Sequence, residues 1–181
     1  GATGVGGGGI GADAAWRTRF KRTNMARAGS GSWSDEVTPV KVIDDLRGER
    51  AGDLRYAVTI GGYDGVHLGH RAVIERTRRE AQSRGAGVAV VTFDPHPAAV
   101  VRPESAPKLL TNLEQKLELL EALAVDATYV VRFDEARASE SAEDFVAEVL
   151  VGCLHAVAVV VGEDFHFGKG RGGNVALLRR L

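Results

Sequence analysis

The chain has 181 residues, of which 44% are hydrophobic and 26% are charged, and its formal net charge is −1. This composition is typical of a soluble globular domain and excludes a disordered chain. A near-neutral charge predicts no bulk attraction to nucleic acid or to an anionic membrane, and no apolar run reaches the roughly 20 residues that span a bilayer. We therefore expect no nucleic-acid, membrane or protein partner, and a function that resides in a local site.

The first 36 residues differ from the rest of the chain. They are rich in glycine and lack a sustained apolar period, so they predict a disordered tail. Their basic residues are also typical of transit peptides and nucleic-acid-binding arms. A solvated tail, or a stretch upstream of the true start near Met25, is the simpler interpretation.

From Pro39 onward, short valine-rich runs alternate with helical periods. Strands are expected at 40–43, 56–60, 88–93, 127–133 and 156–161, and helices at 70–84, 112–124 and 142–154. Thr111 with Glu114 predicts a capping box for the second helix, and Ser141 with Asp144 predicts a weaker cap for the third. The alternation predicts an α/β fold, an open and mostly parallel sheet with helices on both faces. In this architecture ligands bind beyond the carboxyl ends of the strands, at helix N-termini.

The loop TIGGYDGVHLGHR, at 59–71, follows the second expected strand. Gly61, Gly62 and Gly65 can adopt positive φ, and Gly69 keeps the space beside the histidines at 67 and 70 free of a side chain. Helix N-termini attract anions, and imidazoles three residues apart share one helical face, where both can donate to a phosphate. A metal site or an ordinary exposed helix is the alternative. The chain has no HExxH motif and no third ligand at usable spacing, which favours phosphate.

Two later loops carry further signals. After the strand at 88–93, the run Asp94, Pro95, His96 and Pro97 predicts a stiff loop that can wall a pocket with little entropy lost on binding. A plain rigid turn is the alternative. The strand at 156–161 leads into GEDFHFGKGRGG, where Asp164 precedes basic residues set among glycines. That composition suits phosphate, and it equally suits an exposed turn.

These loops together resemble those of bacterial FAD synthetases. GGYDGVHLGH is similar to the G-x-F-D-G-x-H-x-G-H form of the nucleotidylyltransferase HxGH signature, although Gly62 and Tyr63 depart from the residues usual there. TFDPHP is similar to the T-F-x-P-H-P loop, and VGEDFHFGKGRGG to the V-G-x-D-F-x-F-G-x-x-R-x-G stretch. The resemblance covers about residues 39–181 and is to the adenylyltransferase domain of bifunctional riboflavin kinase/FAD synthetase, which has a Rossmann-like fold. The chain stops at Leu181, before the family's I-S-S-T-x-I-R stretch and its kinase domain, so we expect a domain truncated at its C-terminal end.

The resemblance implies that ATP and FMN react to give FAD and pyrophosphate, with Mg²⁺ bridging the phosphates. It implies His67 and His70 as catalytic residues. The ATP-binding residues that it implies are Gly61, Gly62, Tyr63, Asp64, Gly65, His67, Gly69, His70 and Arg171. The FMN-binding residues that it implies are Asp94, Pro95, His96, Pro97 and Asp164, and Asp164 is also a possible magnesium ligand.

Two alternatives to this function stay open. One is another HxGH transferase, acting on phosphopantetheine or nicotinate mononucleotide, and the other is a non-catalytic flavin- or nucleotide-binding fragment. The location is expected to be cytoplasmic, because the single Cys153 lies in an apolar run and favours a reducing compartment.

Overall fold

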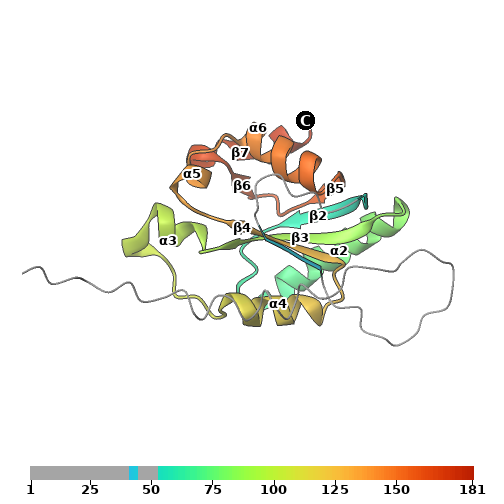
Figure 1. The fold of residues 1–181 in the computed structure, drawn as a ribbon, viewed down its shortest axis with the longest axis horizontal. Helices are drawn as coiled ribbons and strands as arrows, with labels where there is room; N and C mark the ends of the chain where they lie inside the picture. Colours follow the sequence, from blue (N-terminus) through green and yellow to red (C-terminus); the bar gives the residue numbers. More distant parts are fainter. Residues whose placement is uncertain (1–40, 45–52) are drawn as a thin grey trace, which may run out of the picture.

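The computed structural model describes residues 41–44 and 53–181, which build a five-stranded sheet (Figure 1). The strands are β1 (Lys41–Asp44), β2 (Tyr56–Ile60), β3 (Gly87–Asp94), β4 (Ala127–Arg132) and β5 (Ala156–Val160). They lie in the order β1-β4-β3-β2-β5, and every neighbouring pair is parallel. The carboxyl ends of the strands therefore meet at one edge of the sheet, and the predicted α/β fold with an open parallel sheet is confirmed.

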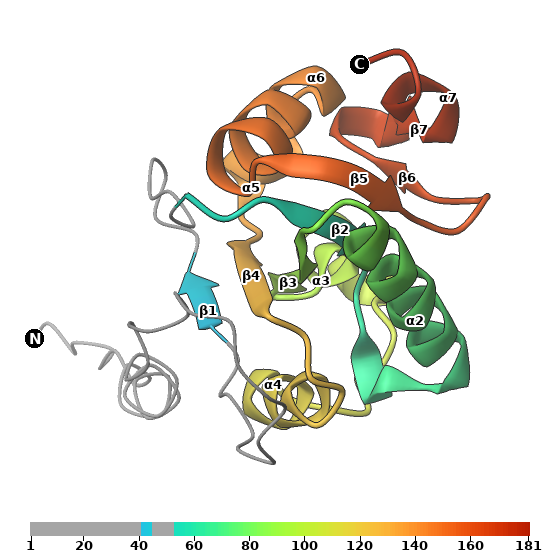
Figure 2. The same cartoon turned by 90° about the vertical axis from the view of Figure 1, so that its right-hand side faces the viewer.

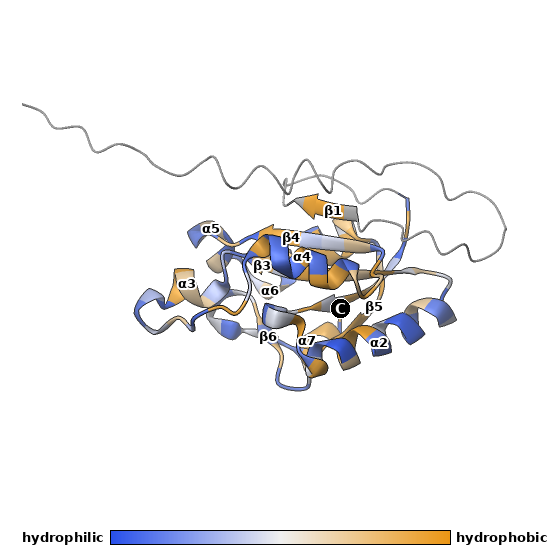
Figure 3. Cartoon of the chain, turned by 90° about the horizontal axis from the view of Figure 1, so that it is seen from below, coloured by the Kyte–Doolittle hydropathy of each residue, from blue (hydrophilic) through white to orange (hydrophobic). Residues whose placement is uncertain are grey.

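Helices cover both faces of this sheet, as the two views in Figures 1 and 2 show. The longer ones are α2 (Leu68–Ser83), α4 (Leu113–Glu121), and α6 (Ala142–Phe145) with the adjoining π-helix η3 (Val146–Cys153). Ala57 of β2 belongs to the core under α2 and α4, whereas Val58 belongs to the core under α6 and η3. Successive strand residues point to opposite faces, so one valine-rich strand supplies two cores. In Figure 3, α2 is hydrophilic along its outer side and hydrophobic toward the sheet.

The shorter elements gather mostly at the carboxyl edge of the sheet. They are η1 (Asp64–Val66), α3 (Pro97–Val101), η2 (Pro103–Ser105), α5 (Glu135–Ala138), β6 (His166–Phe167), η4 (Lys169–Arg171), β7 (Gly173–Asn174) and α7 (Val175–Leu178). Strands β6 and β7 form a small antiparallel pair. These segments supply the loops in which ligands bind in this architecture.

The cap of α4 differs from the prediction. Asn112, not Thr111, is the N-cap: its side chain accepts from the Gln115 N–H at 2.9 Å, and the Gln115 side chain accepts from the Asn112 N–H at 3.0 Å. The predicted Thr111 box is therefore wrong by one residue. The Thr111 hydroxyl instead donates to Asp64 at 2.8 Å, across 47 positions of sequence.

Two helix ends also need correction. Helix α4 ends at Glu121, because the chain turns at Ala124, whose φ is +50°. The third predicted helix changes to a π-helix at Val146, although its cap is confirmed: the Ser141 hydroxyl oxygen accepts from the Asp144 N–H at 3.0 Å.

Some expectations concern residues that the structure does not describe. The predicted disordered tail at 1–36 and the first position of the strand at 40–43 lie outside the described residues. Cys153, the single cysteine of the chain, is buried. Within residues 41–44 and 53–181, no helix is both long enough and apolar enough to cross a membrane.

Candidate active site

The glycine turn between β2 and α2 is held in a strained conformation. Gly65 has φ of +64°, and its neighbours Tyr63 and Val66 also lie in the left-handed region, at +50° and +40°. Such φ values are costly for side chains that are not glycine, and they cluster at ligand-binding turns. Of the three glycines expected to adopt positive φ, only Gly65 does so, and the expectation for Gly61 and Gly62 is wrong.

Gly61 and Gly62 are needed for close approach instead. A Cβ on Gly61 would lie 3.2 Å from the Tyr63 ring, and one on Gly62 would lie 3.3 Å from Nε2 of His96. The Tyr63 ring is buried, and its hydroxyl lies 2.6 Å from the Thr59 hydroxyl. Burial raises the pKa of Tyr63 to about 12, although the hydrogen bond with Thr59 lowers it in part. The turn thus presents bare backbone next to His96.

The two histidines lie together at the start of α2. His67 is the N-cap, and its Nδ1 accepts from the His70 N–H at 3.4 Å. Their rings stack with centroids 3.6 Å apart and planes at 18°. A Cβ on Gly69 would lie 3.1 Å from Cε1 of His67, so the predicted need for a bare residue here is confirmed. The assignment of both rings to one phosphate stays a prediction.

His70 is neutral at pH 7 in the free site. Its pKa is lowered from 6.5 to about 4, chiefly by burial and in addition by the positive charges of His67 and Lys116, whereas the Asp64 carboxylate partly opposes this shift. Its Nδ1 is buried, with no hydrogen-bond partner among the described residues. A bound anion would raise the pKa of such a ring and give it a proton to donate.

Asp64 braces the turn against the segment before α4. Its carboxylate accepts from the Leu110 N–H at 2.9 Å, and from the N–H and hydroxyl of Thr111 at 2.9 and 2.8 Å. Burial alone would raise the pKa of Asp64, but these hydrogen bonds outweigh it and hold the pKa below its usual value. Because its oxygens already accept these bonds, contact with ATP stays a prediction for Asp64.

A cavity of about 540 Å³ opens beside this turn, beyond the ends of β3 and β4. Its walls are largely apolar and include five phenylalanines, Phe93, Phe133, Phe145, Phe165 and Phe167. Phe165 and Phe167 stack with centroids 5.5 Å apart, whereas Phe93 and Phe133 meet edge to face. A cavity of this size and lining suits a flat heterocycle.

The structure divides the residues predicted for FMN. His96 and Pro97 line the cavity, whereas Asp94, Pro95 and Asp164 are exposed and do not line it. His96 begins α3, because its Nδ1 accepts from the N–H of the next residue but one at 3.2 Å. With Nδ1 used in this way and Nε2 directed at the glycine turn, His96 joins the cavity to the turn.

Arg171, predicted for ATP, lies at the cavity as well. It lines the wall from η4, has φ of +59°, and its Nη2 lies 3.4 Å from Nδ1 of His166. That imidazole nitrogen in turn lies 2.7 Å from the carbonyl oxygen of Asp164. Arg171 therefore lines the same cavity as His96. Its contact with the ATP phosphates stays a prediction.

The buried cation Lys116 was missed by sequence reasoning. It is 4% exposed, and its Nζ lies 3.3 Å from Thr92 Oγ1 and 3.4 Å from the carbonyl oxygen of Phe93. Burial lowers the pKa of Lys116, and the carboxylates of Asp94 and Asp64 partly oppose this. The sequence did contain a signal for its burial, because Lys116 lies three residues after Leu113 and so shares the apolar side of α4.

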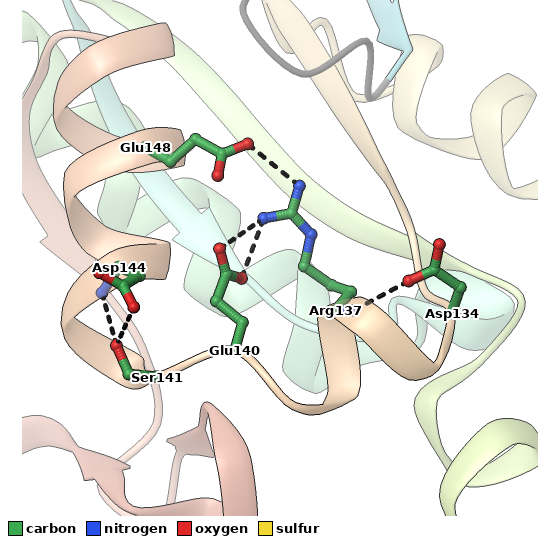
Figure 4. A network of polar contacts seen from close by, with 6 residues as sticks. All are labelled: Asp134, Arg137, Glu140, Ser141, Asp144 and Glu148. Carbon is green, nitrogen blue, oxygen red and sulfur yellow. Dashed lines mark hydrogen bonds and ion pairs between the residues drawn. The ribbon is translucent and has the colours of Figure 1, made fainter.

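A second missed residue, Arg137, holds the far wall of the cavity (Figure 4). Its Nη1 donates to both carboxylate oxygens of Glu140 at 2.9 Å, and its Nη2 donates to Glu148 at 3.3 Å. The Glu140 carbonyl oxygen accepts from the Lys169 N–H at 2.7 Å. The network therefore ties α5, η3 and η4 together around the cavity.

The donor set does not fit a magnesium ion held by the protein alone. In the described part of the chain, no group of three or more His, Cys, Asp or Glu side chains is arranged to hold a metal. Asp164 is exposed, and its Oδ1 lies 3.1 Å from where a Cβ on Gly162 would be. Magnesium is commonly bound through one or two carboxylates and substrate phosphates. The role of Asp164 as a magnesium ligand stays a prediction, and no reaction step is derived through the metal.

Comparison with known proteins identifies the family. The FAD synthetase family matches residues 50–181, which is well over half of the chain. The chain belongs to the FAD synthetase family. Its FAD synthetase relatives include two proteins named bifunctional riboflavin kinase/FMN adenylyltransferase. The one from Escherichia coli (strain K12) is 40% identical over 123 residues, covering 68% of this chain and 39% of the relative. The one from Listeria monocytogenes is 43% identical over 118 residues, covering 65% and 37%.

The chain spans about two fifths of the length of these FAD synthetase relatives. Among solved structures, one titled as a macrolide-efflux protein from Streptococcus pneumoniae matches with a TM-score of 0.62 and 23% identity. That match covers 77% of this chain and 46% of the other. At this identity the likeness supports the fold of the FAD synthetase domain, and nothing about its function.

Proposed function

We propose that this chain carries an FMN adenylyltransferase activity, which makes FAD and pyrophosphate from ATP and FMN. The observation that carries the proposal is the adjacency of two sites in a member of the FAD synthetase family. An aromatic cavity of about 540 Å³ lies beside a glycine turn with stacked histidines, and His96 joins the two. The flavin ring would occupy the cavity, and the phosphates of ATP would face the turn.

The chemistry requires one bond to form and one to break. A terminal phosphate oxygen of FMN attacks the α-phosphorus of ATP, and the bond from that phosphorus to the β-phosphate oxygen breaks, which releases pyrophosphate. The attacking oxygen is already anionic, so no strong general base is needed, and positioning with charge stabilisation supplies the rate. Bound magnesium supplies charge neutralisation on the phosphates.

His67 and His70 would act on the charge that builds up at the α-phosphate. Both rings lie at the N-terminus of α2, where unpaired N–H groups also favour anions. A neutral His70 ring can donate one hydrogen bond when ATP enters the site, and it can take up a proton as the negative charge of the phosphates approaches. Loss of one such donor commonly costs about a hundred- to a thousandfold in rate.

The test is a chromatographic assay of the purified chain with MgATP and FMN, which measures FAD and pyrophosphate. We expect FAD to form, and His67→Ala and His70→Ala each to lower the rate by about a hundredfold or more. His155→Asn is the matched control, because His155 precedes β5 at the opposite edge of the sheet. Unchanged rates in both site variants would refute the role of the histidines.

Other acceptors separate this proposal from its alternatives. Phosphopantetheine and nicotinate mononucleotide are to be offered in place of FMN under the same conditions. Adenylyl transfer to either one, but not to FMN, would favour a different HxGH transferase. Binding of FMN or ATP in calorimetry without product would identify a non-catalytic binding domain. We also propose a cytoplasmic location, which the single buried Cys153 supports.

A further inference from the structure

Lys116 is a buried cation for which the proposed reaction has no use. It extends from α4 toward the carboxyl end of β3, and it is 4% exposed. Its two hydrogen bonds, to Thr92 Oγ1 and to the carbonyl oxygen of Phe93, are long, at 3.3 and 3.4 Å. Burying an ammonium group is costly unless its protons find good acceptors. A methionine side chain could fill the space of the lysine methylene groups equally well. Packing therefore does not explain why a charged group is buried here.

Thr92 connects this ammonium to the glycine turn. The Thr92 hydroxyl donates its single proton to the carbonyl oxygen of Gly62 at 3.1 Å. Only the lone pairs of that hydroxyl are then left for Lys116, so the ammonium must be the donor in the second bond. One hydroxyl therefore links a charge on α4 to the peptide group at 62, which belongs to the turn assigned to ATP above.

Charged and titratable groups from four neighbouring segments interact electrostatically with Lys116. Asp64 comes from η1, His70 from α2, and Asp94 and His96 from the end of β3 and the start of α3. After burial, the positive charge of Lys116 is the next cause that lowers the pKa of His96, and it also contributes to the low pKa of His70. The ammonium thus lies at the point where the turn and the cavity loop meet.

We propose that Lys116 is a positioning residue for the nucleotide turn: through Thr92 its ammonium fixes the Gly62 carbonyl, and with it the peptide groups that face the phosphates. This inference rests on the proposed function, because only that function assigns the turn to ATP. The ammonium does not compete with a substrate for space, since the Lys116 side chain is buried. It adds a fixed positive potential where two anionic substrates must meet.

Four variants of the 181-residue chain test this role. Lys116→Met removes the charge, Lys116→Arg keeps it, and Thr92→Val removes the linking hydroxyl while leaving the charge in place. Lys108→Met makes the same chemical change at an exposed position and is the control. For each variant, calorimetry gives the MgATP affinity, and NMR gives the carbonyl ¹³C shift of Gly62 and the ring pKa of His70.

We expect Lys116→Met to weaken MgATP binding by about tenfold or more, the size of one charge-assisted contact. It should also move the Gly62 carbonyl resonance and raise the pKa of the His70 ring. Thr92→Val should weaken binding and move the Gly62 resonance, but leave the His70 pKa where it is. Lys116→Arg should fall between Lys116→Met and the wild type, and Lys108→Met should match the wild type.

Wild-type affinity and an unmoved Gly62 resonance in Lys116→Met would overturn the proposal. An unmoved Gly62 resonance in Thr92→Val would overturn the link through the hydroxyl, even if Lys116→Met bound ATP poorly. Failure of the wild-type chain to bind MgATP would count against the proposed function instead. The NMR measurements need no ligand, so in that case the Gly62 and His70 signals still decide the role of Lys116.

Discussion

Replacing Arg137 by methionine tests the ion-pair network in the cavity wall. The Arg137 side chain is 3% exposed and that of Glu140 is 14% exposed, so the variant leaves a buried carboxylate without the guanidinium. Removing one partner of a buried pair costs about 3–5 kcal/mol of unfolding free energy. We expect about 3 kcal/mol, because Glu148, the other partner, is 40% exposed and the solvent screens its share.

A double variant and a surface control separate charge from packing. Arg137→Met with Glu140→Leu removes both members of the closer pair, and an apolar pair in place of a buried ion pair is often neutral or stabilising. The double variant should therefore lie within about 1 kcal/mol of the wild type. In the exposed pair of Arg84 and Glu80, the side chains are 44% and 37% exposed, so Arg84→Met should cost less than about 1 kcal/mol.

Urea denaturation at several pH values measures these differences. Burial already raises the pKa of Glu140 above its usual value, and the Arg137 guanidinium partly opposes this rise. Without the guanidinium, the folded pKa rises further above the unfolded value. The ionised carboxylate then destabilises the fold at pH 7, and this penalty is relieved as the pH falls through the folded pKa. The deficit of Arg137→Met should therefore shrink between pH 7 and pH 4.5. Equal losses in Arg137→Met and Arg84→Met, or a double variant as unstable as the single one, would refute this reasoning.

Three further changes test the site and its frame. Because the pKa of His70 is lowered from 6.5 to about 4, the stability that its neutral ring contributes is complete above pH 6.5 and is lost as the pH falls toward 4. His70→Gln should flatten that part of a curve of thermal stability against pH. Gly173→Ala places a Cβ 2.6 Å from that of Ala142, and this overpacking should cost about 1–3 kcal/mol in urea denaturation. Asp64→Asn removes the negative charge to which the N–H and hydroxyl of Thr111 donate, and it replaces Oδ2, the acceptor for the Leu110 N–H, by an NH₂ group. It should cost about 1–2 kcal/mol and change the Thr111 amide shift in NMR.

The central strands of the sheet could be predicted because nearly all of their residues are buried. In β2 and β3 the central residues are buried on both faces, so nearly continuous apolar runs of five to eight residues were a sufficient signal. Helix ends were less predictable, because a side chain can cap a helix only when it is not already hydrogen-bonded to another part of the structure. Thr111 has the right chemistry for a cap, but its hydroxyl is used by Asp64, and Asn112 caps α4 instead.

The glycine turn was located correctly and partly explained for the wrong reason. Three glycines in one turn suggest positive φ, yet Tyr63 and Val66 take the left-handed conformations beside Gly65. Gly61 and Gly62 are bare because a tyrosine ring and an imidazole approach them. The His96 ring comes from a loop more than thirty positions away, and a sequence pattern gives no distance across such a gap.

The two buried cations show where sequence reasoning reaches its limit. Lys116 stands with Leu113, Leu117 and Leu120 on one side of a regular helix, so an i, i+3, i+4, i+7 pattern with a lysine inside it could have been flagged. Arg137 lies in α5, a helix of four residues that is too short to have a period. Its burial is decided by Glu140 and Glu148, on segments whose packing no local pattern specifies. A charge on a long amphipathic helix can thus be predicted as buried from its own segment, whereas a charge in a short loop helix requires the tertiary structure.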